Sequence, residues 1–127
     1  MKKILIVNSN YYKNISEKLL FSSKKMLNNI FKVEVINVPG IYEIPIAIRK
    51  NIKKFDGFVA IGCVIKGKTA HFDLISKSVI DAIMYISIDS KKPIGNCILT
   101  CFNYKQALKR KNKGKEAALA INSILYK

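Results

Sequence analysis

Apolar runs alternate with amphipathic stretches along the whole chain, and no linker or repeat interrupts them. Residues 58–64 form an almost continuous apolar run, which is typical of a strand that is covered on both faces. Residues 3–8 predict another buried strand. Residues 33–38 and 94–100 predict two more, because Pro and Gly bound them.

Between these strands, apolar residues recur at helical spacing. The spacing predicts helices over residues 16–30, 43–54, 72–88, 104–110 and 115–126. Pro45 fits the first turn of the second of these helices. Strands that alternate with helices predict a single domain over residues 1–127. We expect an α/β fold with a four-stranded parallel sheet and helices on both faces.

Composition narrows the class of protein. Half of the 127 residues are hydrophobic, and no apolar run reaches the roughly 18 to 20 residues of a membrane span, so we expect a cytoplasmic protein. The net charge of +15 comes mainly from scattered lysines, in a chain also rich in Ile and Asn, as a genome-wide compositional bias would produce. Arginine, the better bidentate phosphate ligand, occurs only at Arg49 and Arg110. We expect no nucleic-acid partner, although a basic nucleic-acid-binding protein stays open as an alternative.

The three cysteines, Cys63, Cys97 and Cys101, lie within apolar stretches. An odd number of buried cysteines argues against a disulfide framework. One distant histidine adds too few ligands for a metal site. We therefore expect unreactive buried thiols and no metal.

Ligands of parallel α/β sheets bind beyond the carboxyl ends of the strands, and the unusual polar and aromatic residues of this chain follow its predicted strands. Residues 67–71 follow the third strand and open a helix, a position suited to an anion. His71, the chain's only histidine, is a candidate for proton transfer. Tyr11 and Tyr42 are candidates to sandwich a flat ring. The alternatives are an ordinary capped loop, a structural histidine and packed tyrosines.

Two further candidates for the site are Glu43 and a basic cluster late in the chain. Glu43 is expected at a helix start, where a carboxylate is favourable without any further role. Arg110 and Lys113 belong to a basic run that is usually a solvated face. Arg110 is the more notable because arginine is scarce here.

Residues 38–45 read VPGIYEIP, residues 62–73 read GCVIKGKTAHFD, and residues 99–114 form a third motif-rich block. These three blocks resemble the lumazine synthase family of riboflavin synthesis. Residues 38–45 (VPGIYEIP) resemble its VPG-aromatic-E-I-P signature, and residues 62–73 (GCVIKGKTAHFD) resemble its G-x-V-I-x-G-x-T-x-H-aromatic-D segment. Residues 99–114 contain its L-T-x-x-N-x-x-Q-A-x-x-R and N-K-G elements. The resemblance runs nearly end to end, although the segment between Arg110 and Lys113 is several residues shorter than in relatives.

The resemblance implies a flavodoxin-like, three-layer α/β/α sandwich. It implies condensation of 5-amino-6-(D-ribitylamino)uracil with 3,4-dihydroxy-2-butanone 4-phosphate to 6,7-dimethyl-8-ribityllumazine, the penultimate step of riboflavin synthesis, without a metal or cofactor. It also implies small-molecule substrates and sites between subunits of a homopentamer or a pentamer-based assembly. A flavin- or lumazine-binding module without catalysis is the alternative on the same scaffold.

The resemblance implies that residues at matching positions have the roles known for the family. His71 would transfer protons. The pyrimidine substrate would be bound by Tyr11, Tyr42, Glu43, Cys63, Val64, Ile65 and Asn96. The phosphate would be bound by Lys68, Thr69, Arg110 and Lys113. Of these residues, Asn96, Arg110 and Lys113 would serve the pocket of a neighbouring subunit.

Overall fold

The computed structural model describes residues 1–66 and 71–126, apart from the side chain of His71. Strands and helices alternate along this part of the chain. They are β1 (Lys3–Ser9), α1 (Lys13–Leu27), β2 (Lys32–Val38), the 3₁₀ helix η1 (Ile41–Glu43), α2 (Ile44–Lys50), β3 (Gly57–Ile65), α3 (His71–Ser90), β4 (Ile94–Cys101), α4 (Tyr104–Lys109) and α5 (Lys113–Leu125).

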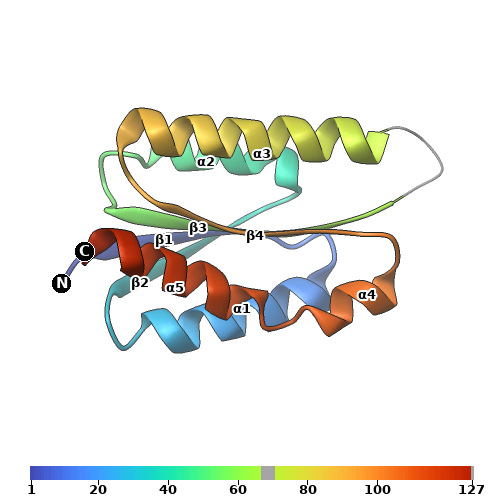
Figure 1. Cartoon of the computed structure of the whole chain (residues 1–127), viewed down its shortest axis with the longest axis horizontal. Coiled ribbons are helices and arrows are strands. Elements are labelled where there is room, and N and C mark those ends of the chain that lie inside the picture. The colour runs from blue at the N-terminus through green and yellow to red at the C-terminus, as the bar shows by residue number, and fades with distance from the viewer. Residues whose placement is uncertain (67–70, 127) are drawn as a thin grey trace.

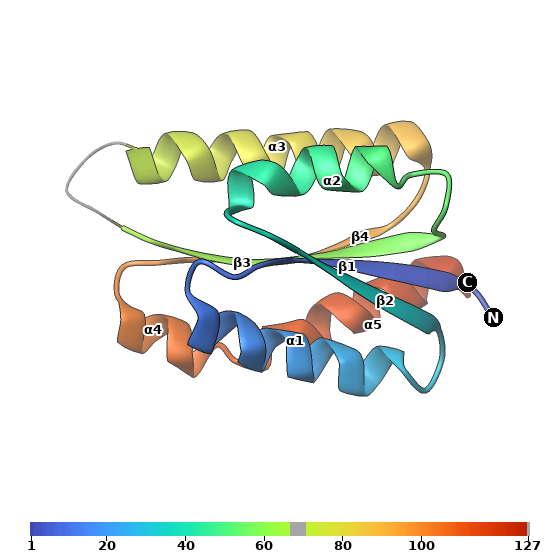
Figure 2. The ribbon, with the colours of Figure 1, turned by 180° about the vertical axis from the view of Figure 1, so that it is seen from behind.

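The strands form one sheet in the order β2-β1-β3-β4, and all neighbouring strands run parallel. Helices α2 and α3 cover one face, and α1, α4 and α5 cover the other (Figure 1). The view from behind shows the same three layers, with β2 at the near edge (Figure 2). The predicted α/β/α sandwich around a four-stranded parallel sheet is confirmed.

The core lies on both faces of the two central strands. Alternate residues of β1 face opposite helical layers, so that Ile4 and Ile6 pack toward α1 and α5, whereas Leu5 and Val7 pack toward α2 and α3. Burying each such side chain stabilises the fold by about 1.5–3 kcal/mol. The edge strands are more open, and the polar residues Asn96 and Thr100 of β4 are exposed.

The second predicted helix differs in the structure. Residues 43–54 were expected to form one helix, but η1 precedes a shorter α2, which ends at Lys50. Asn51 then adopts a non-helical conformation, and its Nδ2 donates to the carbonyl oxygen of Ala47 at 2.8 Å. A side-chain bond to the backbone satisfies a carbonyl that the helix end leaves free, so the prediction of a helix to residue 54 is wrong.

The first helix also starts earlier than predicted, at Lys13, and it has no side-chain cap. The hydroxyl of Ser16 donates to the carbonyl oxygen of Lys13 within the helix.

Among the described residues, no helix combines the length and apolar character that a membrane crossing requires.

Candidate active site

The short helix η1 carries two of the predicted site residues at the carboxyl edge of the sheet. Tyr42 is exposed, whereas Glu43 is half-buried and its Oε1 accepts a hydrogen bond from the Gly40 backbone N–H at 3.0 Å. This bond occupies one carboxylate oxygen and closes the turn that enters η1. The second oxygen of Glu43 remains available as an acceptor for a polar ligand.

Close packing against β3 holds η1 at this edge. A β-carbon added to Gly62 would lie 2.5 Å from Cγ2 of Ile41, a separation too short for two carbon atoms. The absence of a side chain at position 62 therefore lets η1 approach the strand. Because Ile41 is the first residue of η1, this contact places Tyr42 and Glu43, which follow it, next to β3.

Tyr11 stands at the same edge, after β1. Its side chain is exposed, and its ring meets that of Tyr12 edge-on with the centroids 5.0 Å apart. Aromatic pairs in this arrangement hold one another in place, so Tyr12 orients the Tyr11 ring. Tyr11 and Tyr42 thus both present aromatic surface beyond the strand ends.

The end of β3 supplies the next three predicted residues. Val64 and Ile65 are half-buried, whereas the side chain of Cys63 is buried in the core between the sheet and α1. Burial raises the pKa of the Cys63 thiol to about 12. A thiol with this pKa is protonated at neutral pH and is a poor nucleophile, so only the backbone of Cys63 is suited to contact a ligand.

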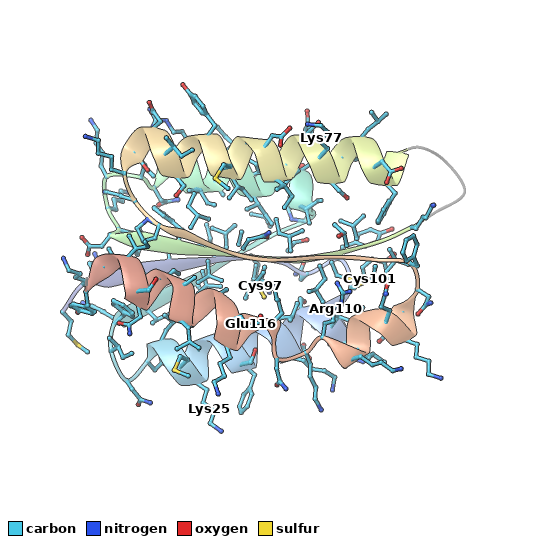
Figure 3. The ribbon with its side chains drawn as sticks, viewed as in Figure 1. Lys25, Lys77, Cys97, Cys101, Arg110 and Glu116 are labelled. Carbon is cyan, nitrogen blue, oxygen red and sulfur yellow. The ribbon has the colours of Figure 1, made fainter. Side chains whose placement is uncertain are left out.

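The side chains of Cys97 and Cys101 are also buried. Their side chains point from β4 into the layer of α1, α4 and α5 (Figure 3), and burial raises the pKa of the Cys97 thiol to about 12 and that of the Cys101 thiol above its ordinary value. All three cysteines are free thiols. The prediction that the three cysteines are buried is confirmed, and the raised pKa values are in keeping with unreactive thiols.

A second group of predicted residues meets beside the free edge of β4. Asn96, Arg110 and Lys113 line a surface depression of about 480 Å³, together with Thr100, Lys109 and Glu116 among others. We call this the β4-edge depression. Three cations face one carboxylate there, and the only ion pair is a loose one, with 3.9 Å between Lys113 Nζ and Glu116 Oε1 among the described atoms. The depression therefore favours an anion.

Two side-chain hydrogen bonds stand at the start of α4, the short helix that Arg110 follows. Asn103 Oδ1 accepts from the Gln106 backbone N–H at 2.8 Å, and Gln106 Oε1 accepts from the Phe102 backbone N–H at 2.7 Å. This arrangement caps the start of α4. Arg110 follows the last residue of this short helix, so the cap also helps to place the Arg110 backbone. Figure 3 shows Arg110 and Glu116 in the layer of α4 and α5.

The structure does not bring the two groups together within one chain. Tyr42 and Glu43 border a separate depression of about 390 Å³ between α2 and α3, and it shares no lining residue with the β4-edge depression. Asn96 lies with Arg110 and Lys113, the two residues with which the resemblance assigned it to a neighbouring subunit's pocket. The predicted Lys68 and Thr69 lie outside the described residues, as does the side chain of His71, whose backbone begins α3.

Thr100, Lys109 and Glu116 were not singled out from the sequence. A signal for Thr100 exists, because it is four residues from Asn96 and both are polar in an otherwise apolar strand. A larger depression, about 700 Å³, lies elsewhere, along α1 and the start of α5, and is lined by Lys18, Phe21 and Lys25 among others. It contains none of the predicted site residues.

Fold and site together define the class of protein. It is a flavodoxin-like α/β protein with aromatic and carboxylate groups at the carboxyl edge of the sheet and an anion-favouring depression beside an edge strand.

Comparison with known proteins identifies the particular family. The sequence matches the family 6,7-dimethyl-8-ribityllumazine synthase over residues 1–126. A protein of that name from Novosphingobium aromaticivorans is 41% identical, with 98% of this chain and 95% of the relative covered. Those from Bartonella bacilliformis (40% identical, 92% and 84% covered) and Corynebacterium kroppenstedtii (34% identical, 93% and 79% covered) are similar over most of their length.

The chain belongs to the lumazine synthase family. The resemblance predicted from the three sequence blocks is therefore confirmed, together with the transferase function in riboflavin biosynthesis that it implied. The alternatives, a binding module without catalysis and a nucleic-acid-binding protein, are not favoured.

Proposed function

We propose that this chain condenses 5-amino-6-(D-ribitylamino)uracil with 3,4-dihydroxy-2-butanone 4-phosphate in a site that two copies share. The observation that carries the proposal is the separation of the two groups of residues. Tyr42 and Glu43 stand at the carboxyl edge, whereas Arg110 and Lys113 line the β4-edge depression. Family membership supplies the reaction, and a second copy supplies the way to bring both groups to one pair of substrates.

In the proposed reaction, the 5-amino group attacks the ketone, and loss of water gives an imine. Inorganic phosphate then leaves, the carbon chain rearranges, and ring closure releases a second water. The two products besides the lumazine are thus water and phosphate. The protein's task is to align two substrates, stabilise the departing phosphate and move protons.

Each residue group has a proposed part in this task. Tyr11 and Tyr42 stack on or flank the pyrimidine, and Glu43 accepts hydrogen bonds from ribityl hydroxyls through its free oxygen. The backbone of Cys63, Val64 and Ile65 borders the same ring. Alignment of this kind contributes several kcal/mol to catalysis.

Phosphate and proton transfer fall to the remaining residues. Arg110 from the neighbouring copy pairs with the phosphate, with Lys113 beside it, and stabilises the leaving dianion. Lys68 and Thr69 hold the same phosphate from the segment of the sequence that precedes α3. His71 acts as the acid or base, a role that typically contributes about 10²- to 10⁴-fold.

Exposed apolar residues support association with further copies. On α3, which packs on the sheet beside β4, Leu74, Met84, Tyr85 and Ile88 are each more than half exposed. Apolar groups of this size on one outer helix face favour a protein–protein contact. We propose a homopentamer or a pentamer-based assembly, and a cytoplasmic enzyme whose partners are its substrates and its own copies, with neither membrane nor nucleic acid.

The test is a mixing experiment on the intact assembly. His71→Asn and Arg110→Ala are each expected to be nearly inactive, and the first assay is lumazine fluorescence with both substrates. Co-expressed in equal amounts, the two variants form hybrid assemblies in which about a quarter of shared sites combine an intact His71 with an intact Arg110. Recovery of that fraction of activity supports a shared site.

Two results would contradict the proposal. Hybrids as inactive as their parents would show that both residues act within one chain. If a folded wild-type assembly formed no lumazine, the proposed reaction itself would be refuted. Arg49→Ala is the matched control, because Arg49 is the other arginine, is exposed on α2, and lies outside both depressions.

A further inference from the structure

The depression of about 700 Å³ along α1 is long, because it follows one side of that helix. Its lining residues on α1 run from Asn14 to Met26, which spans about 18 Å at the rise of an α-helix. They lie on the side that faces away from the sheet, where Figure 3 shows Lys25. Residues 111, 112 and 115, at the start of α5, form the other wall. We call this depression the α1 groove.

Hydrogen bonds between the two walls fix the width of the α1 groove. The hydroxyl of Ser22 donates to the carbonyl oxygen of Lys111 at 3.1 Å. The hydroxyl of Ser23 donates to the carbonyl oxygen of Gly114 at 3.2 Å, one residue further into α5. The groove is therefore formed before any partner arrives, so binding does not have to order its walls.

The α1 groove combines apolar side chains with an excess of lysines. Phe21 is 69% exposed, and the half-buried Met26 packs against the core. Four lysines and one carboxylate, that of Glu17, give the lining a net charge of +3. None of the four belongs to a salt bridge among the described residues; they are Lys18, Lys25, Lys111 and Lys115.

We propose that the α1 groove binds an acidic amphipathic helix of a partner protein. The apolar face of such a helix would cover Phe21 and Met26, and its carboxylates would lie against the lysines. Aromatic residues are common anchors in interfaces of this kind, and Met adapts to the side chains that meet it. The inference goes beyond the proposed function, because no residue assigned to the substrates lines this groove.

Charge favours an acidic partner over a second copy of this chain. The eight acidic residues of the chain are at least eight positions apart, so none of its segments presents carboxylates on consecutive helical turns. Two α1 grooves facing one another would oppose lysine with lysine, which is unfavourable. A nucleic acid matches the groove less well, because the groove contains no arginine and, among its described lining residues, only one aromatic ring for stacking.

Fluorescence anisotropy with a labelled, designed peptide tests the proposal on the intact assembly. The acidic probe has about 14 residues, enough for a helix of about 21 Å, with leucine on one face and glutamate on the other. A basic probe has lysine in place of each glutamate. We expect the acidic probe to bind at least about tenfold more tightly than the basic one, and added salt to weaken its binding.

A substitution at the apolar anchor separates a specific groove from general attraction to a basic protein. Phe21→Ser should raise the Kd of the acidic probe by about tenfold, because a central aromatic anchor contributes much of the binding energy in such a groove. Leu119→Ser is the matched control, because Leu119 is exposed on α5 but does not line the groove. The control should leave the Kd unchanged.

Charge reversal tests the lysines in the same way. The double variant Lys18→Glu with Lys25→Glu should reverse the preference between the two probes. Lys53→Glu with Lys54→Glu is the matched control, since both lysines are exposed and line none of the three depressions. It changes the net charge equally, so the preference should stay as in the wild type.

Other outcomes would overturn the proposal. Absence of binding, equal binding of both probes, or an unchanged Kd in Phe21→Ser would show that the groove does not recognise an acidic amphipathic helix. Displacement of the acidic probe by oligothymidylate at lower concentration than by unlabelled probe would make nucleic acid the occupant. A smaller assembly mass in Phe21→Ser would make a second copy the occupant. Lumazine formation is assayed separately, so a wild-type chain without activity would refute the proposed function and leave this test intact.

Discussion

The contact between α1 and α5 is so close that it leaves no room for a side chain at Gly114, the second residue of α5. A β-carbon there would overlap the carbonyl oxygen of Leu19 and the hydroxyl of Ser22, and would lie 2.6 Å from the hydroxyl of Ser23. The Leu19 oxygen belongs to the backbone of α1 and cannot rotate away. In the native packing, Ser23 Oγ instead donates to the Gly114 carbonyl oxygen at 3.2 Å.

Gly114→Ala should therefore destabilise the protein. Overpacking of this kind costs about 1–3 kcal/mol, and separating the helices would lose a hydrogen bond of about 1 kcal/mol. The higher helix propensity of Ala returns about 1 kcal/mol or less. The net expectation is a loss of about 1–4 kcal/mol in the free energy of unfolding, which for a chain of this length lowers Tm by roughly 5–15 °C.

Urea unfolding followed by circular dichroism provides the measurement, at one protein concentration because subunit association also stabilises the fold. Gly40→Ala is the matched control. Its backbone is extended, with φ −149°, and a β-carbon there would meet only Glu43 Oε1 at an ordinary 3.4 Å. The control should be as stable as the wild type. If Gly114→Ala were as stable as the wild type, α1 and α5 would not pack closely enough to exclude a side chain at position 114.

Three further changes test local features. Lys91 adopts φ 59°, a left-handed conformation that favours glycine, so Lys91→Gly should raise the free energy of unfolding by about 1 kcal/mol, and a lower urea midpoint would contradict this. The Lys92 ammonium donates to the Phe55 carbonyl oxygen at 2.9 Å, so Lys92→Met should cost about 1–3 kcal/mol, whereas an unchanged midpoint would show that water replaces it. Burial raises the pKa of Cys63 and Cys97 to about 12 from 9.0, so the folded state resists thiol ionisation that the unfolded chain allows. Stability should fall as pH rises above about 9, by up to about 1.4 kcal/mol per pH unit for each thiol, and the slope should flatten in Cys97→Ala.

The arrangement of the strands was predictable because local signals agree with it. The apolar run of residues 58–64 predicts a central strand, and β3 does lie between β1 and β4 with its first seven residues buried. Alternation of strands and helices leaves few topologies open, since crossovers between parallel strands are right-handed. The burial of the cysteines followed from the same apolar context.

The boundaries of the second helix could not be predicted in this way. Apolar spacing continues past Lys50 through Ile52, but the end of α2 depends on the Asn51 side chain bonding back to Ala47. The start of η1 depends on the missing side chain of Gly62, about twenty residues further along the chain. The approach to Gly62 joins residues distant in sequence, whereas the Asn51 bond is a side-chain-to-backbone contact within one turn, and apolar periodicity carries no information about either.

By itself, then, the sequence determined the order of the elements, the parallel α/β class, the family and the positions that carry its motifs. These depend on local periodicity and on residue identity, which are present in the chain before it folds. The resemblance had already assigned Asn96, Arg110 and Lys113 to a neighbouring subunit's pocket, but only the tertiary structure showed that these three line one depression while Tyr42 and Glu43 border another. That grouping depends on which edge of the sheet β4 occupies and on how α4 and α5 return beside it, and both are set by packing between segments that are far apart in the sequence.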